Sequence, residues 1–173
     1  VTGETILLLN LNETDYPRGT WWSLSEAAIE TAASLVVHLS ASGAALSLIT
    51  NGRDPISPGN EEPAVPAATG PEQAETILTV LARVEMALGR SFADLAATHG
   101  NAASWGTRLL LLTPVWSTEL NDLSLALRHH GRMPVPVLIG AYRQAKETAR
   151  AGLPCLLARP DQERGGVRIT LAE

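Results

Sequence analysis

Short apolar runs alternate along the chain with longer segments in which apolar residues recur every three or four positions. The runs lie at 5–11, 44–50, 108–113, 135–139 and 154–158. Apolar runs of this length are typical of strands that are buried on both faces of a sheet. A further strand is predicted at 167–171, where apolar and polar residues alternate.

Amphipathic helices are predicted between these strands, at 23–42, 71–88, 92–98, 117–130 and 143–151. Ser23 and Glu26 have the spacing of a capping box, in which each side chain bonds the other residue's backbone amide. Gly43 is expected to end this first helix. Ser117 or Thr118 is expected to cap the fourth helix.

The segment 53–70 is rich in proline and glycine. It could form a loop, or a ragged antiparallel edge strand near 64–65. Pro63 and Pro66 suit only an edge, because proline has no backbone N–H to contribute to a central ladder.

Strands that alternate with helices predict an α/β domain with a doubly wound, mostly parallel sheet and helices on both faces. Ligands of such sheets bind beyond the carboxyl ends of the strands. Here those ends fall at 10–20, 50–55, 113–118 and 140–143. We expect a functional site at this edge.

Length and composition indicate one domain, 1–173. Because the sequence begins with valine, we expect it to be a piece of a longer chain, and the alternative is the removal of an initiator methionine. A net charge of −5 argues against a general nucleic-acid binder. No apolar run is long enough to span a membrane. The single cysteine, Cys155, excludes an internal disulfide and a cysteine-based zinc cluster, and its apolar surroundings predict a core position.

No recognisable catalytic motif is present. The sequence has neither phosphate-binding nor dinucleotide-binding glycine loops, and no serine lies in a Gly-x-Ser-x-Gly frame. His129 and His130 end a predicted helix, where the helix dipole favours them without any ligand. We therefore assign no catalytic residue, metal or cofactor, and we expect a binding function.

The polar loop 10–19 after the first strand is the strongest local feature. It could contact a partner, or its side chains could satisfy the backbone groups of a turn. Trp116 follows a central strand nearby. If exposed it would be an interface anchor, and the alternative is a ring that lies over the top of the sheet.

Several stretches together resemble one protein family. They read LLLNLNET, SLSEAAIETAASLVVHL, LITNGRDP, ILTVLARVEMALGRSFADL and WGTRLLLLTPVWSTEL. They resemble the domain-of-unknown-function family numbered fifty-eight, whose members carry a von Willebrand factor A-like domain. The resemblance runs from Ile6 to about Gly140. It implies a Rossmann-like sheet with one antiparallel edge strand, and an interaction or adaptor module that is not an enzyme.

Longer members of this family carry membrane helices before the domain, and their genes neighbour a MoxR-type AAA+ ATPase. The resemblance therefore implies a soluble domain on the cytoplasmic face of a membrane-anchored protein. Its implied partner is a protein, specifically an ATPase of the MoxR type.

Von Willebrand A domains often hold a divalent cation at a metal-ion-dependent adhesion site, through Asp-x-Ser-x-Ser, a distant threonine and a distant aspartate. These positions fall on Asn10, Asn12, Thr14, Thr69 and Pro114. Both carboxylates are missing, and a hard cation prefers anionic oxygen ligands. The resemblance thus implies a degenerate site without metal. The candidate partner contacts are Asn10, Asn12, Thr113, Trp116, Ser117 and Glu119.

Three interpretations remain open at this point. The preferred one is a non-catalytic protein–protein interaction module. The alternative is an α/β enzyme or small-ligand binder with an unrecognised site at the carboxyl edge, and the third is a purely structural domain. A pocket with convergent polar groups would favour the alternative, whereas a flat or filled edge would favour the interaction module.

Overall fold

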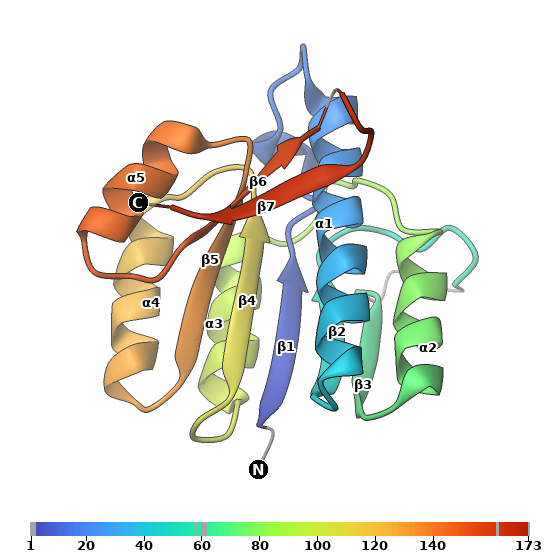
Figure 1. Ribbon diagram of the computed structural model, residues 1–173, viewed down its shortest axis with the longest axis horizontal. Helices are drawn as coiled ribbons and strands as arrows, with labels where there is room; N and C mark the ends of the chain where they lie inside the picture. The colour runs from blue at the N-terminus through green and yellow to red at the C-terminus, as the bar shows by residue number, and fades with distance from the viewer. Residues whose placement is uncertain (1–2, 58, 60–61, 162, 173) are drawn as a thin grey trace.

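The computed structural model describes residues 3–57, 59, 62–161 and 163–172, and it places helices on both faces of a seven-stranded sheet (Figure 1). The strands are β1 (Glu4–Leu9), β2 (Ala45–Thr50), β3 (Ala64–Ala68), β4 (Arg108–Thr113), β5 (Met133–Ile139), β6 (Leu156–Pro160) and β7 (Val167–Leu171). The helices are α1 (Trp21–Ala41), α2 (Pro71–Leu81), α3 (Phe92–Ala102), α4 (Thr118–His129) and α5 (Tyr142–Arg150), with a short 3-10 helix, η1 (Glu13–Asp15).

The strand order β3-β2-β1-β4-β5-β6-β7 confirms the predicted doubly wound sheet. Its five inner strands are parallel. Both outer strands, β3 and β7, are antiparallel to their neighbours, where the family resemblance implied only one such edge. In the described part of the chain, no helix is long and apolar enough to cross a bilayer.

The core lies on both sides of the sheet because the inner strands are apolar at successive positions. In β1, Leu7 and Leu9 pack into the cluster under α1 and α2, whereas Ile6 and Leu8 join the cluster on the side of α3, α4 and α5. Successive side chains of a strand point to opposite faces. A continuous apolar run is therefore what a strand covered on both sides requires.

Two prolines in β5 are compatible with its inner position. The backbone N–H of Met133 donates to the Thr107 carbonyl oxygen, so every second residue of β5 directs its N–H toward β4. Pro134 and Pro136 occupy the positions that face β6 instead. Because β6 pairs with β5 only over Val137–Ile139, these prolines remove no hydrogen bond from the ladder.

The first helix begins earlier than its predicted cap. It starts at Trp21, with Thr20 as the N-cap residue and no side-chain cap bond. The expected capping box of Ser23 and Glu26 is wrong, because Ser23 already lies in the first turn and its hydroxyl donates to the Thr20 carbonyl oxygen at 3.0 Å. The cap of α4 is confirmed: the Ser117 hydroxyl accepts from the backbone N–H of Leu120 at 3.1 Å.

The second helix ends at Leu81, well before the predicted 88. Arg53 and Glu85 exchange two backbone hydrogen bonds, both 2.9 Å long, and Ala87 donates to the Leu11 carbonyl oxygen at 3.1 Å. Backbone groups that pair with distant loops cannot also form a helix. Leu88, at the end of the predicted helix, lies outside α2 and is 78% exposed.

The remaining boundaries agree with the predictions to within a few residues. Cys155 is buried in the core as expected, and β6 begins just after it. In the segment 53–70, β3 confirms the edge-strand alternative, with Pro66 inside it. Positions 58, 60 and 61 of that segment, and the ends 1–2 and 173 of the predicted domain, lie outside the described residues.

Candidate functional site at the carboxyl edge of the sheet

The carboxyl ends of the parallel strands β1 and β4 lie at the upper edge of the sheet in Figure 1. Polar side chains at the ends of β1, β2 and β4 are hydrogen-bonded to one another there. Asn10 follows β1, Asn51 follows β2, and Thr113 is the last residue of β4. Because these strands are parallel and adjacent, their carboxyl ends lie side by side. All three residues are buried.

The Asn10 side chain, 1% exposed, is the centre of this cluster. Its Nδ2 donates to Asp15 Oδ2 at 2.8 Å and to Thr113 Oγ1 at 3.0 Å. Its Oδ1 accepts from the backbone N–H of Asn12 at 3.0 Å and from Asn51 Nδ2 at 3.2 Å. A side-chain amide has two donor hydrogens and two acceptor positions. Every hydrogen-bonding position of Asn10 is therefore occupied within the chain.

Asn51 joins two loops to this centre. Its Oδ1 accepts from the backbone N–H of Leu11 at 2.7 Å, and its Nδ2 also donates to the Arg90 carbonyl oxygen at 3.0 Å. Gly89 allows the close approach, because a Cβ at this position would lie 2.3 Å from the Asn51 carbonyl oxygen. Asn51 is not among the predicted site residues, because the pair Asn51-Gly52 is also typical of a plain turn. The signal for its role was its place directly after a buried strand.

Tyr16 closes the cluster from the side of η1. Its hydroxyl donates to the Asn10 carbonyl oxygen at 2.7 Å, and the ring is buried. Burial, followed by the nearby charge of Asp15, raises the pKa of the Tyr16 phenol far above its ordinary value. The phenol therefore remains a neutral donor throughout the physiological range.

Asn12 and Thr14 lie in the same loop but bond mainly to each other. Asn12 Oδ1 accepts from the backbone N–H of Thr14 at 3.3 Å and from its hydroxyl at 3.1 Å. Asn12 thereby caps η1, and its Nδ2 has only a long contact, 3.5 Å, to the Gly89 carbonyl oxygen. This bonding is the turn-stabilising role that short polar residues commonly have.

The structure does not bring Thr69 to this cluster. Thr69 follows Ala68, which pairs with Leu46 near the amino end of β2. It therefore lies at the opposite edge of the sheet from Asn10. Pro114, in contrast, directly follows Thr113 and is buried at the carboxyl edge. Among the residues that the structure describes, no three His, Cys, Asp or Glu side chains lie close enough to hold a metal ion.

Trp116 is buried, which makes the exposed-anchor interpretation wrong. It is 9% exposed and belongs to the core cluster on the side of α3, α4 and α5. Its backbone N–H donates to Gln144 Oε1 at 3.0 Å, which ties the loop to α5. Asn10 and Thr113 are likewise too buried to contact a partner directly. Of the other candidate contacts, Ser117 is half-buried and Glu119 is exposed.

An open hollow of about 580 Å³ lies beside the buried cluster. Its lining residues are Glu13, Thr14, Tyr16, Arg18, Trp21, Met86 and Leu88. Trp21 is 45% exposed and packs edge-on against Trp22, with 5.7 Å between the ring centroids. The carboxyl edge thus combines a filled polar centre with an open hollow that both apolar and charged side chains line.

No model of a known protein family matches the sequence, and no curated protein matches it. Several solved structures are similar in fold. A von Willebrand factor type A protein from Catenulispora acidiphila has a TM-score of 0.53 and 15% identity, over 92% of this chain and 39% of that chain. The pilus adhesin SpaC from Lactobacillus rhamnosus GG has a TM-score of 0.52 and 11% identity, over 79% of this chain and 24% of that chain.

An aerotolerance-related membrane protein from Bacteroides fragilis NCTC 9343 has a TM-score of 0.50 and 11% identity, over 99% of this chain and 82% of that chain. The chain spans less than half the length of the adhesin and of the Catenulispora protein. At these identities the comparisons establish the fold alone.

Proposed function

We propose that this domain, whose fold is von Willebrand factor A-like, is a non-catalytic protein–protein interaction module with a degenerate adhesion site. The observation that carries the proposal is the closed hydrogen-bond network of Asn10, beside a hollow at which Trp21 and Leu88 are exposed. The polar centre holds the loops in place, and the hollow takes a side chain of the partner.

The residues present do not fit a divalent cation. Asn10 directs amide hydrogens toward Asp15 and Thr113, and its oxygen already accepts two hydrogen bonds. Pro114 has no side-chain ligand at the position of the second acid, and Thr69 lies at the other edge of the sheet. A hard cation needs anionic oxygen ligands. Partner binding is therefore proposed to be independent of magnesium and calcium.

The apolar residues around the hollow suit a protein partner. Trp21, Trp22 and Leu88 are 45%, 64% and 78% exposed, and all three lie in the loops of the carboxyl edge or at the start of α1. Aromatic and large aliphatic side chains at a pocket are the usual anchors of interfaces. Ser117 and Glu119, at the start of α4, extend the same edge.

The bonding of these polar groups also weighs against a catalytic or small-ligand site centred on Asn10. A small-molecule pocket usually presents a few convergent polar groups to its ligand. Here the convergent groups of Asn10, Asn51 and Thr113 bond to one another instead. The purely structural interpretation leaves the exposed tryptophans without a role.

The finer proposal concerns the partner and the parent protein. The resemblance to family fifty-eight implies that the module belongs to a membrane-anchored protein and acts with a MoxR-type AAA+ ATPase. The fold likeness to a membrane protein of Bacteroides fragilis is consistent with such a parent.

The test is a binding measurement between the purified domain and the MoxR-type ATPase of the same organism, by biolayer interferometry with excess magnesium or with EDTA. We expect equal affinity in both buffers. Trp21→Ala and Leu88→Ser should each weaken binding by about tenfold or more, as the loss of an interface anchor does. The matched control is Trp105→Ala, which removes an 85% exposed tryptophan before β4, at the opposite edge.

Binding that EDTA abolishes would contradict the degenerate site. Affinity that is unchanged in Trp21→Ala and Leu88→Ser, or lost equally in Trp105→Ala, would contradict the proposed surface. An absence of binding to the ATPase, with the domain folded, would overturn the proposed partner.

A further inference from the structure

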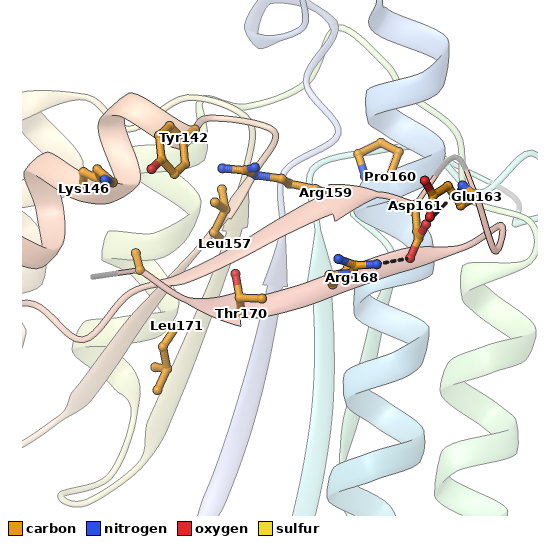
Figure 2. Close-up of a pocket in the computed structure, with 11 residues that line it drawn as sticks. Tyr142, Lys146, Leu157, Arg159, Pro160, Asp161, Glu163, Arg168, Thr170 and Leu171 are labelled. Carbon is orange, nitrogen blue, oxygen red and sulfur yellow. Dashed lines mark hydrogen bonds and ion pairs between the residues drawn. The ribbon is translucent and has the colours of Figure 1, made fainter.

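A second hollow lies away from the polar cluster, between α5 and the hairpin of β6 and β7 (Figure 2). Its volume is about 710 Å³, within the range of roughly 300–1,000 Å³ that is common for small-molecule pockets. Tyr142 and Lys146 of α5 form one wall. Leu157 and Arg159 of β6 face them, and Thr170 of β7 extends the same side.

Two cationic side chains are held against one aromatic ring at this hollow. Lys146 Nζ lies 4.9 Å from the centroid of the Tyr142 ring, and Arg159 Cζ lies 4.3 Å from it. Figure 2 draws them on either side of the ring. A hydrogen bond from Lys146, together with the charges of both residues, lowers the pKa of the Tyr142 phenol. The contacts with the ring position both charges.

Of the two acidic residues that line the hollow, Asp161 is already engaged. Asp161 Oδ2 accepts from Arg168 Nη2 at 2.9 Å, and Asp161 Oδ1 accepts from the backbone N–H groups of Glu163 and Arg164. These bonds, that of Arg168 first, hold the pKa of Asp161 below its ordinary value. Glu163 lines the end of the hollow near Asp161.

Neither cation at the Tyr142 ring is neutralised in this way. Within the described residues, no carboxylate forms an ion pair with Lys146 or Arg159. This arrangement is notable in a chain whose net charge is −5, since carboxylates are plentiful elsewhere on it. Two fixed positive charges at an open hollow attract a negatively charged ligand.

We propose that this hollow binds a small, multiply charged anion of the phosphate or carboxylate type. The Arg159 guanidinium contacts two of its oxygens and the Lys146 ammonium contacts another, which matches the geometries that these groups favour. Leu157, on the same face of the hairpin as Arg159, provides an apolar wall for the body of the ligand. The proposal is independent of the interaction surface around Trp21.

Titration calorimetry with sodium pyrophosphate and with citrate, at constant ionic strength, tests the proposal. We expect saturable binding of at least one probe with a Kd at or below about 1 mM, which corresponds to about 4 kcal/mol. Preference for pyrophosphate assigns the phosphate type, and preference for citrate assigns the carboxylate type. Lys146→Gln and Arg159→Gln should each weaken binding by about tenfold or more.

The matched control is Arg164→Gln, which removes an exposed arginine from the turn of the same hairpin, outside the hollow. It should leave the Kd unchanged. The proposal is overturned if neither probe saturates, or if Arg164→Gln weakens binding as much as Arg159→Gln. Circular dichroism of each variant verifies that the fold is retained.

Tyr142 supplies a second, local readout. The chain has two tyrosines, and the other, Tyr16, is buried with a raised pKa. The first tyrosinate absorbance transition on raising the pH therefore belongs to Tyr142 and should vanish in Tyr142→Phe. Saturating pyrophosphate or citrate, whichever binds, should shift this transition to higher pH, because it offsets the positive charges of Lys146 and Arg159. Binding without that shift would place the anion elsewhere and overturn the assignment.

Discussion

Replacing Asn10 by aspartate would restore the acid that von Willebrand A domains carry at this position, and we predict that it destabilises this domain. Asn10→Asp exchanges one donor group, the Nδ2 amide, for an oxygen. That oxygen would face Asp15 Oδ2, now 2.8 Å from Nδ2, and Thr113 Oγ1, now 3.0 Å away. Both donated hydrogen bonds are lost, and two carboxylates are brought together.

The magnitude follows from these contacts. A lost hydrogen bond costs about 0.5–1.5 kcal/mol with a neutral partner and about 1.5–3 kcal/mol with a charged one. Two carboxylates about 4 Å apart repel by about 4 kcal/mol at an effective dielectric constant of about 20. Water around the half-buried Asp15 screens part of this repulsion, and proton uptake relieves more of it. We therefore expect a net loss of about 3–5 kcal/mol, a large share of the roughly 5–15 kcal/mol that stabilises a domain.

The effect should depend on pH. Burial and the charge of Asp15 raise the pKa of the introduced carboxyl in the folded state, so the folded variant binds more protons than its unfolded chain. Its free energy of unfolding then falls, relative to the parent, as the pH rises above the unfolded pKa of about 3.9. The deficit should be small near that pH and largest at neutral pH. Urea denaturation followed by circular dichroism at several pH values measures the deficit and its dependence on pH.

Asn12→Asp is the matched control, because it makes the same chemical change in the same loop. The Asn12 side chain acts mainly as an acceptor for Thr14, and its Nδ2 makes only one donor contact, which is 3.5 Å long. The free energy of unfolding of Asn12→Asp should be less than about 1 kcal/mol below that of the parent, since no strong donated hydrogen bond is removed. The reasoning is refuted if Asn10→Asp is as stable as the parent at neutral pH, or if both variants lose the same amount.

Two further predictions concern buried aromatic residues. Trp116→Ala should lower the free energy of unfolding by about 3–5 kcal/mol, because Trp116 is 9% exposed and packs in the core. Equal urea midpoints for Trp116→Ala and for Trp105→Ala, which removes an exposed tryptophan, would contradict this packing. Since burial raises the pKa of Tyr16, parental stability should fall as the pH rises above the ordinary tyrosine value of 10.0. Tyr16→Phe should reduce that fall. At neutral pH it should lower the free energy of unfolding by about 1–3 kcal/mol, because the Asn10 carbonyl oxygen loses its partner. If the stability of Tyr16→Phe, measured by urea denaturation at alkaline pH, fell with pH as steeply as that of the parent, Tyr16 would not be the cause.

The inner strands were predictable because their apolar runs reflect burial on both faces, which is a local property of the sequence. The end of α2 was not, because the backbone of Glu85 and Ala87 pairs with loops that are distant along the chain. A helical repeat continued through this segment, and tertiary pairing overrode it. The capping box at Ser23 failed for a related reason, since its spacing occurs inside the first turn of a helix that starts earlier.

The candidate site was predictable in part. Asn10 and Asn12 could be identified because polar residues directly follow a buried strand. The role of Asn51 depends on β2 lying next to β1, and strand order cannot be deduced from periodicity. The backbone of Trp116 is similarly held by Gln144, which α5 brings to the loop from a distant part of the chain.

The short contact between β5 and β6 has a consequence for the motions of the domain. β4 and β5 pair from Arg108 to Thr113, whereas β5 and β6 pair only over Val137–Ile139, and Pro134 and Pro136 offer no further N–H groups on that side. We therefore expect the segment that contains α5, β6 and β7 to open at a lower free energy than strands β1, β4 and β5. Amide hydrogens of β6 should exchange with solvent sooner than those of β1 and β4, and an anion held between α5 and the hairpin would slow that opening.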